Sequence, residues 1–139
     1  MTNLYLSMED LSPEQIVDLA NGYRDMARAL NEFQVLRWPE LTFDQHLDLN
    51  AYQNSLLNRA QDLQTLAVRP AFEKAADMVK NIQLATDEAK ASLKRIHTIS
   101  IALNVGAITV ALASYVARAN LRGIQTALRE LGELLVTDE

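Results

Sequence analysis

The longest regular pattern of apolar positions runs over residues 71–135, where apolar or small residues recur at alternating steps of three and four without a proline. This spacing keeps one stripe of side chains on one face of a helix and is typical of knobs-into-holes packing. The stripe, called the seam below, contains Phe72, Ala75, Val79, Ile82, Thr86, Ala89, Leu93, Ile96, Ser100, Leu103, Ala107, Val110, Ser114, Ala117, Leu121, Ile124, Leu128, Leu131 and Leu135. It predicts a long helix over about 71–119 and a short C-terminal helix over 124–135.

Two places in this stretch carry residues that tolerate a helix break, Asn104–Gly106 and Asn120–Gly123. The seam keeps its phase across both, which favours a continuous helix through at least the first. A single helix over 71–135 would be about 98 Å long, so a compact monomer needs a break. We place it at Asn120–Gly123, because asparagine and glycine tolerate the left-handed conformation at a helix C-terminus.

Two helices are predicted before this stretch. Ser12-Pro13-Glu14-Gln15 has the composition of a capping box with proline at the first helical position, so a helix begins at Pro13 and ends before Pro39. Thr42-Phe43-Asp44-Gln45 repeats the box and starts a second helix that continues to about Val68. Its predicted apolar face contains Phe43, Leu47, Leu49, Tyr52, Leu56, Ala60, Leu63 and Ala67.

The fold class predicted from these elements is all-α, an antiparallel bundle of about four helices with short connections. A chain of 139 residues is long enough for one domain with a core and too short for two of ordinary size. We therefore expect a single domain over 1–139, with an N-terminal arm over 1–11 and a frayed tail over 136–139.

A second apolar stripe lies in the middle of the long helix. It contains Ile101, Val105, Ile108, Leu112 and Tyr115 and points away from the seam. A helix that is apolar all round must be covered on both sides, so this stripe is predicted to be a partner or oligomer interface. Asn104, the strongly polar residue of 99–117, either fixes the register of such an assembly or is a local, water-bound side chain.

Charge is distributed unevenly along the chain, whose formal net charge is −5. Residues 1–48 hold nine acidic and three basic residues, whereas residues 89–129 hold six basic residues and no acidic one. The simplest interpretation is that the acidic front docks on the basic back within one bundle. The alternative is a cationic rim around the apolar centre, formed by Lys94, Arg95, Arg118 and Arg122.

Residues that carry catalysis or bind metals are sparse. The chain has no cysteine and no Glu-x-x-His pair, and its four glycines are dispersed. His46 and His97 are interpreted as a surface residue and a residue flanking the bundle. We therefore predict no enzyme activity, no metal, no cofactor and no small-molecule substrate. Nucleic acid is not expected as a partner either, since only Tyr115 lies among the basic residues as a stacking group.

The sequence thus predicts a non-enzymatic helical module that binds protein, either another copy of itself or a dedicated partner such as a toxin or secreted cargo. The alternative is a membrane-active protein whose segment 99–117 inserts conditionally into a bilayer. An apolar segment with cationic flanks within long amphipathic helices resembles the architecture of α-helical pore-forming toxins, without a shared motif. Trp38 is expected to cap the end of the core, with an exposed anchor as the other possibility.

The sequence does not determine the cellular compartment of the protein. Met1–Asp10 carries two acidic residues and is not typical of a cleaved secretory signal, so cytoplasmic localisation is the default expectation. Export or conditional membrane association remain alternatives.

Overall fold

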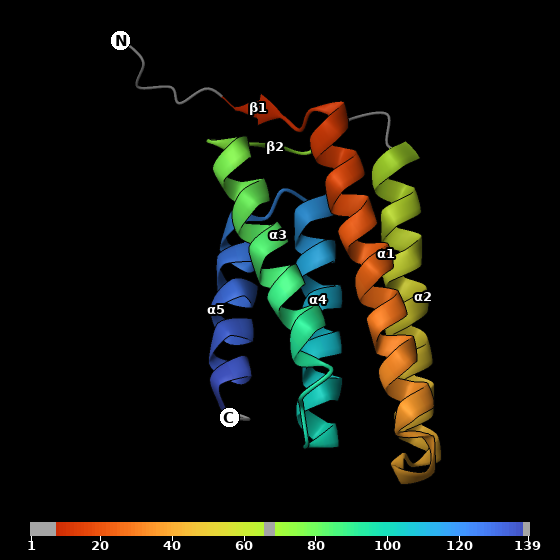
Figure 1. Cartoon of the computed structure of the whole chain (residues 1–139). Helices are drawn as coiled ribbons and strands as arrows, with labels where there is room; N and C mark the ends of the chain where they lie inside the picture. Colours follow the sequence, from red (N-terminus) through yellow and green to blue (C-terminus); the bar gives the residue numbers. More distant parts are fainter. Residues whose placement is uncertain (1–7, 66–68, 138–139) are drawn as a thin grey trace.

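The computed structural model describes residues 8–65 and 69–137, and over these residues the chain forms five α-helices, one short 3-10 helix and one two-stranded sheet (Figure 1). The helices are α1 (Pro13–Leu36), α2 (Phe43–Thr65), α3 (Ala75–Ser92), α4 (Ile99–Ala117) and α5 (Leu121–Thr137). The 3-10 helix η1 spans Trp38–Glu40, and the strands are β1 (Glu9–Asp10) and β2 (Ala71–Phe72). The predicted all-α bundle is confirmed.

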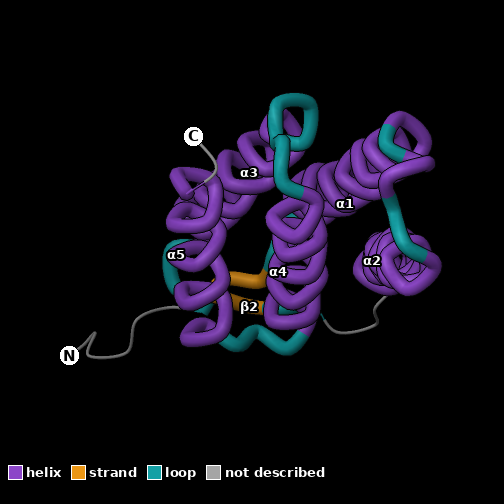
Figure 2. Tube along the Cα trace, turned by 90° about the horizontal axis from the view of Figure 1, so that it is seen from below, coloured by secondary structure: helices purple, strands orange, loops and turns teal. Residues whose placement is uncertain are grey.

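The five helices form a ring around one core. Successive helices run in opposite directions, so α1, α3 and α5 point one way and α2 and α4 the other (Figure 1). Each helix has two main neighbours, in the order α1, α2, α4, α5, α3 and back to α1 (Figure 2). The seam and the apolar sides of α1 and α2 supply most of the core inside this ring.

Both capping boxes form as predicted. The Ser12 side chain accepts a hydrogen bond from the Gln15 backbone N–H at 3.1 Å, and the Gln15 side chain accepts one from Ser12 N–H at 2.8 Å. Thr42 and Gln45 exchange the same pair of hydrogen bonds at the start of α2. These bonds satisfy backbone donors that have no partner within the helix, and they fix both starting points from local sequence alone. The predicted end of the second helix at Val68 lies outside the described residues.

The third helix begins later than predicted. Residues 71 and 72 form β2, which pairs antiparallel with β1 in the register Glu9↔Phe72, and the helix starts at Ala75. The Glu9 carboxylate accepts a hydrogen bond from Ala75 N–H at 3.0 Å, so a residue of the expected arm caps α3 from 66 positions away. This long-range cap explains why the local sequence pattern misplaced the start.

The predicted long helix over 71–119 is wrong, because α3 ends at Ser92 and α4 begins at Ile99. The chain reverses through residues 93–98, which contain neither glycine nor proline. Leu93 and Ile96 stay buried in this turn, so the reversal keeps their apolar area in the core. The division gives helices of comparable length that close a compact ring, which a helix of about 70 Å could not do.

The turn also changes which side of the helix is buried. In α3 the seam residues from Ala75 to Ala89 are buried, as predicted, but none of the seam residues in α4 is fully buried. The core-facing side of α4 consists of Ala102, Val105, Gly106, Thr109, Leu112, Ala113 and Val116. The heptad phase therefore describes the core only up to the turn and again in α5, where Ile124, Leu131 and Leu135 are buried.

The predicted break near residue 120 is confirmed, and Asn104–Gly106 lies inside continuous helix. Ala119, rather than a glycine, takes the left-handed conformation with φ of 53°, and Asn120 N–H donates to the Tyr115 carbonyl at 2.9 Å. The Asn120 side chain then accepts from Gly123 N–H at 3.0 Å and caps α5. Gly123 itself is helical.

Gly123 is required by a close approach of α4 to α5. A Cβ atom added at this position would lie 2.5 Å from the Tyr115 ring, whereas one added at Gly132 in the same helix would meet nothing within 4 Å. We expect Gly123→Ala to lower the free energy of unfolding by about 1–3 kcal/mol, because the ring must move. Urea unfolding followed by circular dichroism measures the change.

Gly132→Ala is the matched control. It should raise the free energy of unfolding by about 0.5–1 kcal/mol, since alanine is the better helix former and has free space there. Equal effects of the two substitutions would contradict the close contact at Tyr115.

Candidate interaction surface at the α1–α2 hairpin

The predicted stripe on α4 is mostly covered within the monomer. Val105 and Leu112 are 0% and 1% exposed and belong to the core, while Ile101, Ile108 and Tyr115 are half-buried against it. Tyr115 packs against Gly123 of the neighbouring helix α5. The folded monomer therefore does not offer Val105 or Leu112 to a partner.

The other residues predicted on this helix are at the surface. Asn104 is exposed and, with Ile108, lines a shallow groove between α4 and α5 that also includes Glu130, Glu133 and Leu134. The predicted cationic rim is exposed at both ends of α4. Lys94 and Arg95 lie in the turn before the helix, and Arg118 and Arg122 lie around the turn after it. Because Asn104 is exposed, its side chain does not fix the register of helix packing within the monomer. Its role in the register of an assembly stays a prediction.

Helix α4 also has the length and composition of a membrane span. Among the described residues it is the single helix that meets this description, with 19 residues and a mean hydropathy of 1.9. About 39% of the segment is buried in the bundle. A core helix of a protein in water has the same composition, so this property alone does not distinguish the two environments.

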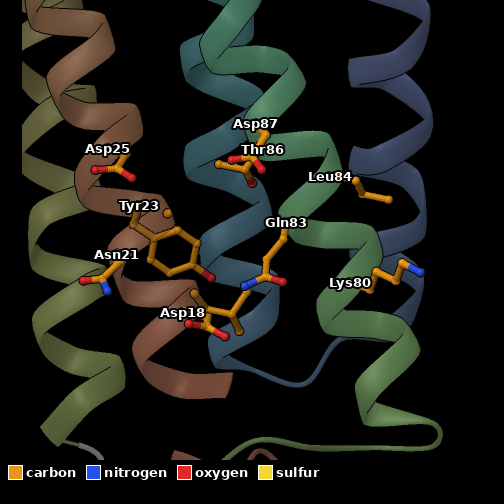
Figure 3. Close-up of a pocket in the computed structure, with 11 residues that line it drawn as sticks. Asp18, Asn21, Tyr23, Asp25, Lys80, Gln83, Leu84, Thr86 and Asp87 are labelled. Atoms are coloured by element: carbon orange, nitrogen blue, oxygen red, sulfur yellow. The ribbon is translucent and has the colours of Figure 1, made fainter. Parts of the chain in front are cut away.

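A polar groove runs between α1 and α3, with a volume of about 320 Å³ (Figure 3). Asp18, Asp25, Lys80 and Asp87 lie along it, so both signs of charge are present. Tyr23 lies on this side of α1 but is only 2% exposed, and among the described residues its hydroxyl has no hydrogen-bond partner. The Thr86 hydroxyl, which also lines the groove, donates to the Ile82 carbonyl within its own helix at 2.8 Å.

Metal binding is not supported by the part of the chain that the structure describes. Within residues 8–65 and 69–137 no group of three or more histidine, cysteine, aspartate or glutamate residues converges. His46 instead uses both ring nitrogens in contacts with Gln34 and with the Trp38 carbonyl.

The most exposed apolar surface lies where α1 turns into α2. Four large side chains project there: Leu36 is 77% exposed, Phe43 75%, Val35 61% and Trp38 55%. These four residues are called the apolar corner below. In Figure 1 this turn extends beyond the neighbouring turn between α3 and α4 at the same end of the bundle. Trp38 is therefore an exposed residue and not the core cap that was expected.

A partly buried polar network centred on Gln34 supports the corner from the inside. Gln34, at 2% exposure, donates through Nε2 to Asn50 Oδ1 at 3.1 Å and lies 3.0 Å from His46 Nδ1, while its Oε1 accepts from Gln53 Nε2 at 2.7 Å. A neutral His46 with its proton on Nε2 satisfies this network, since Nε2 lies 3.3 Å from the Trp38 carbonyl. The rings of Trp38 and His46 also pack against each other, with centroids 4.0 Å apart and an angle of 43° between their planes. The start of α2 is thus fixed to the end of α1.

Arg37 fixes the corner to the rest of the bundle. Its guanidinium donates to both carboxylate oxygens of Glu40, at 2.7 and 3.0 Å, and to the backbone carbonyls of Ile96 and His97, at 3.3 and 3.0 Å. It also lies 5.4 Å from the centroid of the Phe33 ring. The hydrogen bond with Glu40 raises the pKa of Arg37 and lowers the pKa of Glu40. One side chain therefore joins the α1–α2 corner to the α3–α4 turn.

The charges around the corner are predominantly acidic. Between positions 32 and 48 the acidic residues are Glu32, Glu40, Asp44 and Asp48, and all four are exposed. Arg37 is the basic residue of this stretch, and its charge is used by Glu40. On the α3 side, Lys90 and Lys94 line a groove together with Leu36 and Glu32, so basic residues lie there as well. Glu40, Asp44 and Asp48, in η1 and the first turns of α2, are called the acidic rim below.

The sequence pattern did not predict this surface, because the apolar residues of α2 fall into two sets, one buried and one exposed. Leu49, Leu56 and Leu63 recur at steps of seven and are buried, whereas Phe43 and Leu47 fit the same broad stripe but are exposed. The stricter seven-residue spacing was the available signal. Comparison with known proteins adds nothing to this assignment, since no protein-family model, no curated protein and no solved structure matches the chain.

The contacts of Arg37 generate a stability prediction. Arg37→Ala should lower the free energy of unfolding by about 2 kcal/mol, because two backbone carbonyls and a carboxylate lose a charged donor. Arg28→Ala is the control on the same helix. Arg28 is exposed and bonded to Asp25 three residues away, so its removal should change stability by less than about 0.5 kcal/mol. Equal losses in urea unfolding would contradict the role of Arg37.

The unpartnered hydroxyl of Tyr23 generates a second prediction. Tyr23→Phe should raise the free energy of unfolding by about 1 kcal/mol at neutral pH, because a buried hydroxyl without a partner is removed. Burial raises the pKa of Tyr23, and Arg59 partly opposes the shift.

The sign of the pH dependence follows from that shift. A folded pKa above the unfolded value of about 10 means that this residue's contribution is fully present below pH 10 and is lost as the pH rises further. The stability advantage of Tyr23→Phe over the wild type should therefore widen above pH 10. A loss of stability in the variant at neutral pH would show that the hydroxyl has a partner in solution.

Proposed function

We propose that this protein is a non-enzymatic helical interaction module that binds another protein chain through the surface of the α1–α2 hairpin. The observation that carries the proposal is the apolar corner, whose four large side chains are each more than half exposed. Exposed apolar residues scattered singly are ordinary, but several large ones at one projecting turn of the chain are typical of an interaction surface.

The rigidity of the corner supports this assignment. The Gln34 network and the Arg37 contacts fix the turn from two sides, so the apolar side chains are presented on an ordered base. A surface that is ordered before binding loses less conformational entropy when a partner covers it. An aromatic anchor such as Trp38 is also among the residues that contribute most to protein interfaces.

The acidic rim indicates the chemistry of the partner. Glu40, Asp44 and Asp48 are exposed and lie within five residues of Trp38 or Phe43 in the chain, so a partner segment that places basic residues around an apolar face would be complementary on this side. The same rim disfavours an anionic membrane as the binding surface of this corner, since like charges repel.

The alternative function is conditional insertion of α4 into a bilayer. Its length and hydropathy favour this function, and the four basic residues at its ends fit the two interfaces of a membrane. The packing argues against it, because insertion would remove α4 from its contacts with α2 and α5 and expose the core residues Val105 and Leu112. We therefore rank it below the interaction module.

Trp38 provides a direct test, because it is the single tryptophan of the chain and lies in the corner. We would titrate the protein with a tryptophan-free amphipathic peptide built from leucine and lysine heptads. Covering the indole should shift its emission to shorter wavelength with a saturable response. Phe43→Ser should weaken binding about tenfold or more, because burial of one large apolar side chain contributes about 1.5–3 kcal/mol.

Leu84→Ser is the matched control, since Leu84 is an exposed leucine on α3 outside the corner. It should leave the titration unchanged. An emission spectrum that stays constant with the peptide and at every protein concentration would contradict the proposed function. Flotation and dye release with phosphatidylglycerol–phosphatidylcholine vesicles, at neutral and mildly acidic pH, test the alternative. Release that depends on Ile108, lost in Ile108→Glu, would establish the membrane function in place of the interaction module.

A further inference from the structure

The imidazole of His46 packs directly against Trp38 of the apolar corner. The centroids of the two rings are 4.0 Å apart. Trp38 is 55% exposed, whereas His46 is only partly exposed. Histidine is the side chain whose charge ordinarily changes between pH 5 and 8. A histidine in this place makes the charge at the base of the corner depend on pH.

The contacts of His46 are those of a neutral imidazole. Gln34 Nε2 donates to His46 Nδ1 across 3.0 Å, and His46 Nε2 lies 3.3 Å from the Trp38 carbonyl, which accepts its proton. Protonation adds a hydrogen to Nδ1, so that two donors then face each other. The Gln34 amide has to reverse before its oxygen accepts that hydrogen, and the amides of Asn50 and Gln53 then have to reverse with it. The arrangement in the structure therefore belongs to the neutral form of His46.

None of the charged residues at the end of α1 or in η1 bonds to His46 in the part of the chain that the structure describes. The contact of His46 on α1 is the neutral Gln34, whereas Glu32 of the same helix lines the groove toward α3. Arg37 and Glu40 are paired with each other. These two elements thus place no bonded carboxylate against the imidazole.

The acidic residues of α2 near His46 lie on other sides of the helix. Asp44 and Asp48 are two positions before and two positions after His46, and two positions correspond to about 200° around a helix. Over the described ranges, neither carboxylate forms a hydrogen bond or an ion pair with the ring, whose contacts are with Gln34 and Trp38. A proton gained by His46 is therefore not neutralised by a bonded acidic side chain.

We propose that the apolar corner is a pH-dependent binding surface, which holds its partner while His46 is neutral and releases it when His46 gains a proton. The inference rests on the proposed function, because it concerns the regulation of the same corner. A partner that covers Trp38 also removes water from the imidazole packed against it. An imidazolium loses more hydration free energy on burial than a neutral ring does. The partner therefore binds the neutral form more tightly.

The charge of the partner adds to this effect. A protonated His46 places a positive charge at the base of a surface whose acidic rim attracts a basic segment. Aspartate and glutamate ordinarily titrate near pH 4 and lysine above pH 10, so the rim and a basic partner keep their charges between about pH 5.5 and 8. The histidine is the group of the corner that changes charge in this range.

Trp38 reports on His46 without any partner, because it is the single tryptophan of the chain. An imidazolium in contact with an indole quenches its fluorescence more strongly than a neutral imidazole does. We expect the emission intensity of the free protein to fall between pH 8 and 5.5 along a one-proton curve and to stay constant in His46→Gln. Glutamine keeps an oxygen that accepts from Gln34 and has no charge to gain. The matched control is His97→Gln, which changes the other histidine of the chain and should keep the wild-type curve.

The titration with the leucine–lysine peptide, repeated at pH 7.5 and 5.5, tests the release. The dissociation constant of the wild type should be about tenfold or more higher at pH 5.5, because one linked proton changes it by up to about tenfold per pH unit. His46→Gln should bind equally at the two pH values, and His97→Gln should follow the wild type. Circular dichroism at both pH values verifies that the variants are folded, and His46→Asn replaces His46→Gln if the latter unfolds.

The outcomes separate this inference from the proposed function. Equal dissociation constants of the wild type at the two pH values would overturn the pH dependence and leave the interaction module standing. A loss of affinity or of emission at pH 5.5 that persists in His46→Gln would overturn the assignment to His46. No response to the peptide at pH 7.5 would overturn the interaction module, and the inference with it.

Discussion

The arrangement of this bundle depends on one side chain, Arg37, because it joins the two turns at one end of the helix ring. The turn between α3 and α4 exposes backbone carbonyls where α3 ends, and the sequence there contains no glycine or proline to define a stop. Arg37 donates to the carbonyls of Ile96 and His97 from the opposite corner, while Glu40 holds its guanidinium in place. Charged donors satisfying freed carbonyls make a reversal at this place stable.

That reversal determines the environment of the most apolar helix. Without it, α3 would continue directly into α4 as one helix, and α4 could not return between α2 and α5. With it, Val105, Leu112 and Val116 enter the core and the remaining large apolar residues of α4 are half-buried. The outward side of α4 is left with small and polar residues such as Ser100 and Asn104. The apolar composition of this segment therefore reflects its central position in the ring.

The surface left for a partner is consequently on the α1–α2 hairpin, on the side of the ring away from α5 (Figure 2). Its apolar corner stands on the partly buried hydrogen-bond network of Gln34. Buried polar groups are costly unless every member of the network is satisfied, and Gln34 uses its amide nitrogen and oxygen in full. A network of this kind specifies the geometry of the turn more sharply than apolar packing alone would.

The sequence by itself determined the class of fold, the start of α1 and α2, and the break near residue 120. Capping boxes, proline positions and the three–four spacing are local, so the chain within a few residues is sufficient to read them. The same spacing also identified the buried side of α3 and α5.

Only the tertiary structure decided where α3 begins and ends, and which residues form the candidate surface. Glu9 caps α3 from 66 positions away, and Arg37 stabilises the turn after it from 59 and 60 positions away. Both contacts join residues that are distant in sequence, so no local pattern contains them. The exposure of Phe43 and Trp38 has the same origin, because burial depends on where the neighbouring helices end and not on the apolar pattern of α2 alone.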